Sequence, residues 1–102
     1  MAFNVILEDE HRAPIERLED PMGVLDAVLP RADNLDFPFL RTIDPYGDTI
    51  FNRAQMEPFL KEWRKLMKSD LPRERLDVLR DVERLASQCE NEVHLYLRFQ
   101  GD

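Results

Sequence analysis

Residues 93–100 show the clearest alternation of apolar and polar side chains in the chain. A period of two places the two sets on opposite faces of a β-strand. We expect the apolar face of this strand to meet the core. The opposite face then carries His94, Tyr96 and Arg98 in one row.

A second alternating run lies at the other end of the sequence. Phe3, Val5 and Leu7 share one face of a predicted strand. Residues 15–19 follow a polar reversal and are predicted to return as a second strand. Because the apolar residues of this segment are three positions apart, the strand should contain a bulge or form a short sheet edge.

The middle of the chain predicts a β-hairpin. Two β-prone runs, residues 40–43 and residues 49–51, flank residues 44–47, which read DPYG. Asp44 can accept a hydrogen bond from the backbone two residues on, and the proline presets φ at the next position. Gly47 is expected in the left-handed region, where it would close a type I turn.

Apolar residues at spacings of three and four predict three helices. The first begins with Asp20 as its N-cap and ends before Pro30. The second follows Asn52 and Gln55, which have the spacing of a capping box. Pro58 lies near the start of this second helix, and candidate capping residues of the last helix follow its end.

Pro58 falls in the second turn of that helix, where a proline removes one backbone hydrogen bond. We expect one kinked helix, and a short turn at 53–56 followed by a restarted helix is the alternative. The last helix is predicted to be capped by Ser69 or Asp70. Its apolar stripe runs to Cys89, which should therefore be buried.

The elements follow the order ββα-ββ-αα-β along a single domain, residues 1–102. This order predicts an α+β fold, a two-layer sandwich in which an antiparallel sheet of four or five strands carries the helices on one face. The other face of such a sheet can stay open to water. The polar row of the last strand would lie there, with Arg41 nearby.

Composition places the chain among ordinary globular proteins. It has 43% hydrophobic and 34% charged residues, and its single cysteine excludes an intramolecular disulfide. No apolar run approaches the ~20 residues of a membrane span, and no signal-peptide pattern opens the chain. We therefore expect a cytoplasmic protein that does not engage membranes.

The net charge of −7 arises in the N-terminal half of the sequence. Residues 1–52 hold 11 acidic and 4 basic side chains, whereas residues 53–102 hold 10 of each. A nucleic-acid binder would need clustered lysine and arginine, so we do not expect one. An acidic surface fits a basic protein partner. A solubilising surface would also account for the charge, since net charges of about 2–8 are common in small domains.

The sequence contains no signature of catalysis or of cofactor binding. His11, His94 and Cys89 lack the spacing of zinc ligands, and His11 is expected to be a solvated loop residue. The three glycines are isolated, so no glycine-rich phosphate loop exists, and neither serine lies in a nucleophile elbow. We predict no metal, no cofactor and no enzymatic activity.

One polar constellation remains as a candidate binding site. It combines an acid–base group, a phenol and a cation able to clamp an anion. Its members come from the last strand, the central hairpin and the start of the second helix. The candidates are His94, Tyr96, Arg98, Arg41, Asp44, Tyr46, Asp48 and Arg53. A solvated sheet face, a protein-binding face and a small-ligand or catalytic site all fit this pattern.

Two residues of the hairpin region are not explained by turn chemistry. Tyr46 is a large aromatic residue at the tip of the turn. Arg53 opens a helix, where the helix dipole disfavours a cation. We expect Asp44 or Asp48 to pair with Arg53.

Four stretches of the chain resemble a group of short, acidic bacterial proteins of no known function. They are FPFLR at 37–41, IDPYGDT at 43–49, FNR at 51–53 and HLYLRF at 94–99. The resemblance runs nearly end to end and implies a bacterial cytosolic origin, but no activity or catalytic residues. In size, acidity and element order the chain is also similar to immunity proteins that neutralise toxins, without a shared motif.

We therefore expect a non-enzymatic module that binds another protein, with immunity-type inhibition as its most concrete form. The first alternative is a small enzyme or ligand-binding domain using His94, Arg98 and either Asp44 or Asp48. The second is a homodimer in which open sheet faces or edge strands pair, with a structural or regulatory role.

Overall fold

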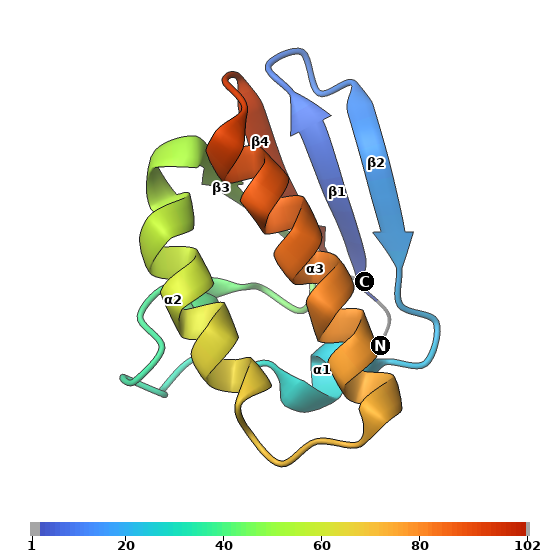
Figure 1. The fold of residues 1–102 in the computed structure, drawn as a ribbon, viewed down its shortest axis with the longest axis vertical. Coiled ribbons are helices and arrows are strands. Elements are labelled where there is room, and N and C mark those ends of the chain that lie inside the picture. Colours follow the sequence, from blue (N-terminus) through green and yellow to red (C-terminus); the bar gives the residue numbers. More distant parts are fainter. Residues whose placement is uncertain (1–2, 102) are drawn as a thin grey trace.

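The computed structural model describes residues 3–101, which form four strands, three α-helices and two short 3₁₀ turns (Figure 1). The elements in chain order are β1 (Asn4–Asp9), β2 (Pro14–Glu19), α1 (Val24–Val28), the 3₁₀ turn η1 (Leu40–Thr42), β3 (Asp48–Asn52), the 3₁₀ turn η2 (Arg53–Gln55), α2 (Met56–Met67), α3 (Arg73–Asn91) and β4 (Leu95–Gln100).

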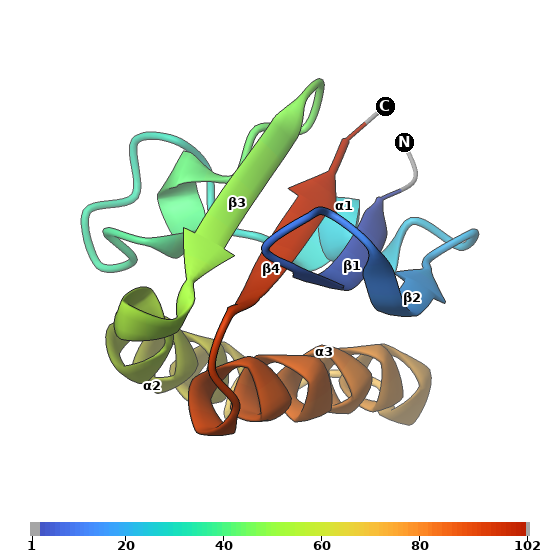
Figure 2. The ribbon, with the colours of Figure 1, turned by 90° about the horizontal axis from the view of Figure 1, so that it is seen from above.

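The strands form one antiparallel sheet in the order β2-β1-β4-β3. Helices α2 and α3 cover one face of this sheet, as Figure 2 shows from above. The predicted two-layer α+β sandwich is therefore confirmed, with four strands. The chain places its last strand in the middle of the sheet, between β1 and β3, so the polar row of β4 lies centrally.

The covered face of the sheet meets the helices around a cluster of aromatic rings. Phe59 stacks on Trp63 with ring centroids 5.5 Å apart, and Phe99 of β4 lies 5.9 Å from Phe59. The indole Nε1 of Trp63 donates a hydrogen bond of 2.9 Å to the carbonyl of Leu79 in α3. Because all of these side chains are fully buried, the apolar stripes of both helices and the inner face of β4 are confirmed.

The N-terminal hairpin has the irregularity that its sequence predicts. Strand β2 is an edge strand, and its register against β1 shifts between Leu7 and Glu8. Glu16 of β2 is tied to α3 by a bidentate contact with Arg84, with distances of 3.0 and 2.6 Å. This contact lowers the pKa of Glu16 and raises that of Arg84. The edge strand is thus held to the helix layer as well as to β1.

The predicted central hairpin is wrong. Residues 40–42 form the 3₁₀ turn η1 instead of a strand, and β3 pairs with β4 alone. The carboxylate of Glu62 in α2 accepts hydrogen bonds of 3.0 and 3.1 Å from the Phe39 amide and of 3.0 Å from the Leu40 amide. A carboxylate that binds consecutive amides at the start of a turn acts as an N-cap. This contact from a distant helix favours a turn over a strand.

The turn at residues 44–47 is confirmed in part. The Tyr46 amide donates to Asp44 Oδ1 at 2.9 Å, as expected for an Asx turn. The expected left-handed backbone at Gly47 is wrong, because positive φ within residues 3–101 occurs at Arg12, Gly23 and His94. A Cβ at position 47 would lie 2.8 Å from Asp44 Oδ2, so a larger residue there would displace the Asp44 side chain that builds the turn.

The helix starts differ from those expected. Helix α1 begins after Gly23, whose φ is 69°, and not directly after Asp20. Asp20 nevertheless binds the helix start, because its carboxylate accepts hydrogen bonds from the amides of Val24 and Leu25. Pro30 follows Leu29, the C-cap, as predicted.

The start of α2 follows the alternative that the sequence left open. Asn52 and Gln55 form the predicted capping box, but they cap the 3₁₀ turn η2, and α2 then begins at Met56. Pro58 is thus the third residue of α2, where a missing amide proton costs no helical hydrogen bond. Helix α3 begins after Pro72 without a side-chain cap, so the predicted cap by Ser69 or Asp70 is wrong.

Candidate functional site

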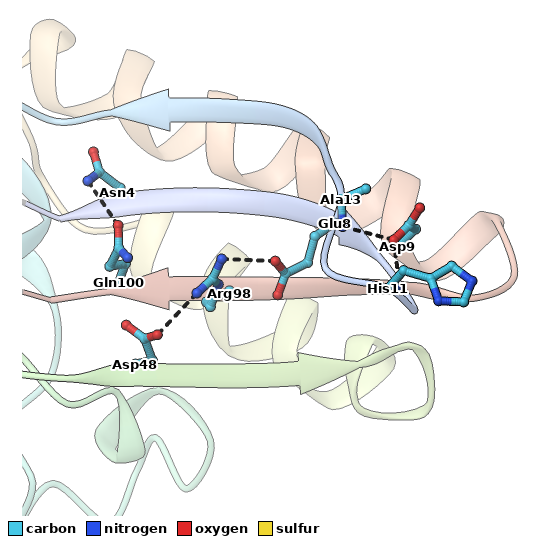
Figure 3. A network of polar contacts seen from close by, with 8 residues as sticks. All are labelled: Asn4, Glu8, Asp9, His11, Ala13, Asp48, Arg98 and Gln100. Atoms are coloured by element: carbon cyan, nitrogen blue, oxygen red, sulfur yellow. Dashed lines mark hydrogen bonds and ion pairs between the residues drawn. The ribbon is translucent and has the colours of Figure 1, made fainter.

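Arg98 lies at the centre of the open sheet face and contacts a carboxylate on each neighbouring strand (Figure 3). Its Nη2 donates to Glu8 Oε2 on β1 at 3.0 Å, and its Nη1 donates to Asp48 Oδ2 on β3 at 3.1 Å. The side chain of Glu8 is only 2% exposed, that of Arg98 17% and that of Asp48 45%. The three groups form a charge network across the sheet.

The strand order creates this network. In register, Arg98 stands between Ile6 of β1 and Ile50 of β3. Its side chain therefore has apolar neighbours directly opposite and reaches diagonally to the carboxylates two residues along each strand. Two anions surround one cation, so the guanidinium is already neutralised. The hypothesis that Arg98 clamps an anionic ligand is not supported by this geometry.

Glu8 is the residue that the sequence analysis missed. The alternation of residues 3–8 places it on the open face, but nothing in the sequence indicates that β1 pairs with β4. An acidic residue at the end of an apolar strand was the available signal. Its burial depends on the pairing of β1 with β4, which brings Arg98 beside it.

His94 does not belong to the row on β4. The strand begins at Leu95, and His94 precedes it with a φ of 63°. Its imidazole is 69% exposed, and its Nδ1 lies 3.1 Å from Glu10 Oε2 in the β1–β2 turn. Val93, predicted to be an inward residue of the strand, is 61% exposed. Helix α3 continues to Asn91, so residues 92–94 form the turn into β4 and the strand begins at Leu95.

Of the remaining candidates, Tyr96 and Asp48 lie near Arg98, and the others are separated from it. Arg41 donates through Nη1 to the carbonyl of Ala32 at 3.0 Å. Arg53 donates through Nε to the carbonyl of Glu90 at 2.9 Å, so the expected pairing with Asp44 or Asp48 is wrong. Glu90 lies in the last turn of α3, where free carbonyls attract a cation.

Asp44 and Tyr46 also lie outside the Arg98 network. Asp44 builds the turn before β3, where its carboxylate accepts a hydrogen bond from the Tyr46 amide and its own amide donates to Thr49 Oγ1 at 2.9 Å. Tyr46 is 74% exposed at the tip of that turn. The eight predicted residues therefore do not converge on one site.

A small recess of about 170 Å³ lies beside the Arg98 network, at the end of the sheet that carries the β1–β2 turn. Tyr96 and Ile50 contribute its apolar walls. Its charged lining residues are Glu8, Asp9, Glu10 and Arg12. Three acids and one base leave this recess with an excess of negative charge.

Asp9 is held as a carboxylate at the edge of the recess. Its Oδ1 accepts hydrogen bonds from the amides of His11 at 2.8 Å and Ala13 at 2.9 Å. These two backbone bonds lower the pKa of Asp9 below its ordinary value. Asp9 therefore shapes the turn and keeps its negative charge at neutral pH.

The acidic excess of the sequence is distributed unevenly over the elements of the fold. Strands β1, β2 and β3 and their connecting loops come from residues 3–52, which hold the acidic excess. Helices α2 and α3 come from the half in which acids and bases balance. The acidic excess therefore belongs to the strands and loops of the first half of the chain, whereas acids and bases balance in α2 and α3, which lie side by side under the sheet in Figure 2.

Cys89 lies in the core, as its place on the helical stripe predicts. It is 0% exposed, and its Sγ lies 3.4 Å from the carbonyl of Leu95. Burial raises the pKa of the Cys89 thiol to about 11. The thiol form is favoured in the folded protein, so this residue stabilises the fold below the ordinary thiol pKa and loses that contribution as the pH rises above it.

We expect the native protein to resist thiol reagents. With a pKa of about 11, roughly one thiol in a thousand is ionised at pH 8, and the sulfur is also shielded from solvent. Alkylation by iodoacetamide at pH 8 should be at least about 100-fold slower than for the same protein unfolded in urea. Equal rates in the two states, followed by mass spectrometry, would contradict the buried placement.

Residues 3–101 contain no group of three or more His, Cys, Asp or Glu side chains arranged to hold a metal ion. Within the same residues, no helix has both the length and the apolar character needed to cross a bilayer. No family model, no curated protein and no solved structure matches this chain.

Proposed function

We propose that this protein is a non-enzymatic binding module that recognises a basic protein partner through the open sheet face, in the manner of an immunity-type inhibitor. The observation that carries the proposal is the acidic recess beside Tyr96. It offers carboxylates at its rim and an aromatic wall, which together suit the ammonium or guanidinium group of a partner side chain.

The individual residues of the recess have complementary roles in this proposal. Glu10 is 48% exposed and is the carboxylate most accessible to a partner. Tyr96 is half-buried and can pack its ring along the aliphatic stem of a lysine or arginine. Ile50 is 42% exposed and extends the contact onto β3. Apolar centres with charged rims are the usual arrangement of binding hot spots.

Catalysis is less well supported by the same geometry. Arg98 is neutralised by Glu8 and Asp48, so it has no free charge to stabilise a developing anion. The exposed His94 contacts Glu10 and lies outside the recess lining. A general base needs a substrate site within hydrogen-bond reach, and the 170 Å³ recess is smaller than the ~300 Å³ at which small-molecule sites begin.

A pull-down from a lysate of the source organism tests the proposal, with wild type, Tyr96→Ala, Glu10→Gln and Glu74→Gln as baits. Glu74 is an exposed acid in the first turn of α3, on the helical side, and serves as the matched control. We expect a basic protein to be retained by wild type and Glu74→Gln at low salt. Each recess variant should weaken its binding by about tenfold, since hot-spot truncations cost more than 1 kcal/mol.

High salt should release the partner, because exposed charges are screened. Equal retention by Tyr96→Ala and wild type would contradict the assignment of the binding face. The absence of any specifically retained protein would argue against a binding module of this kind.

A further inference from the structure

A larger hollow of about 460 Å³ lies at the opposite end of β1 from the acidic recess. Phe3 and Ile43 line it from the protein interior, where their exposed fractions are 2% and 8%. Leu29, at the end of α1, and Tyr46, at the turn before β3, provide further apolar surface. Its volume falls within the ~300–1,000 Å³ typical of small-molecule sites.

The wall of this hollow is fixed by contacts between distant segments. The Arg41 Nη1 bond to the carbonyl of Ala32 holds the segment after α1, and Ala32 itself lines the hollow. The Phe3 carbonyl accepts a 3.2 Å hydrogen bond from the Asp20 amide. The Gly101 amide donates a 2.8 Å hydrogen bond to the carbonyl of Gly47, next to Tyr46. A wall held in this way needs little ordering when a ligand enters.

The side chain of Tyr46 takes no part in the turn on which the residue lies, although its amide does. Asp44 and the backbone form that turn, and the phenol side chain remains 74% exposed beside the hollow. A large, exposed aromatic side chain at the lip of a partly apolar hollow is suited to close over the apolar part of a ligand.

Two opposite charges also line the hollow. Asp26 lies in α1, and Arg31 lies just after Pro30. In the described part of the chain neither takes part in an ion pair with another side chain. One free carboxylate and one free guanidinium, placed around an apolar floor, are complementary to a ligand that carries both charges next to an apolar group.

We propose that this hollow binds a free amino acid with an apolar side chain. Asp26 receives the α-ammonium group and Arg31 the α-carboxylate, while the side chain rests on Phe3 and Ile43 beneath Tyr46. The site lies at the other end of the sheet from the Tyr96 recess, so this inference does not depend on the proposed protein partner.

The test is a titration of the ¹⁵N-labelled protein with L-leucine and L-phenylalanine, followed by amide chemical shifts. We expect saturable shifts at Ala32, Ile43 and Tyr46 by about 10 mM ligand, tenfold above a Kd of about 1 mM. The N-acetyl and the amide derivatives, which each lack one charge, should bind at least about tenfold more weakly, a loss of about 1.4 kcal/mol.

Matched variants locate the site. Tyr46→Ala, Asp26→Asn and Arg31→Gln should each weaken binding by about tenfold, and Tyr96→Ala should leave it unchanged. Unchanged circular dichroism and melting temperature would show that the variants are folded. No saturable shift with either amino acid, equal binding of the blocked derivatives, or loss of binding only in Tyr96→Ala would overturn the inference.

Discussion

Replacing Arg98 with alanine is expected to lower the free energy of unfolding by about 2–4 kcal/mol. The substitution leaves the Glu8 carboxylate, which is only 2% exposed, without the cation that compensates its charge. Removing one partner of a buried ion pair costs about 3–5 kcal/mol when both groups are deeply buried. The lower range applies here because Arg98 is 17% exposed and water can approach the cavity.

The contributions of the Glu8 and Asp48 contacts to stability can be separated by urea unfolding. The variants are Arg98→Ala, Asp48→Asn and the double variant Glu8→Met/Arg98→Met. Asp48→Asn should cost no more than about 1 kcal/mol, because that side chain is 45% exposed. The double variant should recover most of the stability, since unbranched apolar side chains replace the buried charges beside Ile6 and Ile50 and remove the unpaired buried Nε of Arg98. If Arg98→Ala and Asp48→Asn lower the free energy of unfolding by the same amount, the contact between Glu8 and Arg98 contributes less to stability than expected.

Replacing Glu62 with alanine is expected to destabilise the protein by about 2–4 kcal/mol and to loosen the segment around η1. The carboxylate is the acceptor for the amides of Phe39 and Leu40, and Leu40 is fully buried. Each buried amide left without an acceptor costs about 1–3 kcal/mol. Because the cap joins α2 to a turn 22 residues earlier in the chain, its loss should also destabilise residues outside the helix.

Hydrogen exchange gives the site-specific check for Glu62→Ala. The amides of Phe39 and Leu40 should exchange faster relative to the core amides of α2. Glu57→Ala, an exposed acid in the first turn of the same helix, is the control and should cost no more than about 1 kcal/mol. Unchanged protection of the two amides would show that Glu62 does not hold this turn.

The Arg98 variant also affects how binding experiments are interpreted. An arginine on the open face of a strand is ordinarily a suitable choice for a binding mutant. In the folded protein the loss of Arg98 alters stability first, so reduced binding of Arg98→Ala would not identify a contact. Tyr96 and Glu10 can be changed without removing a partner from a buried charge, which makes them the better probes of the open face.

The candidate site shows which features a sequence pattern predicts and which depend on contacts between distant segments. Alternation correctly placed Tyr96 and Arg98 on one face of a strand, because side-chain direction along a strand depends on local geometry alone. The same pattern extended the strand to His94, where the end of α3 and a left-handed backbone intervene. Partners of Arg98 could not be predicted, since they depend on which strands lie beside β4.

The sequence by itself determined the α+β class, the apolar stripes of α2 and α3, the inner face of β4 and the Asn52–Gln55 capping box. These features depend on the spacing of residues within one element or on hydrogen bonds between near neighbours. Only the tertiary structure decided the strand order, the 3₁₀ turn at residues 40–42, the burial of Glu8 and the separation of the predicted site residues. Each of these depends on contacts between segments far apart in the chain, such as Glu62 with Leu40 and Glu8 with Arg98, whose free energies outweigh local preference.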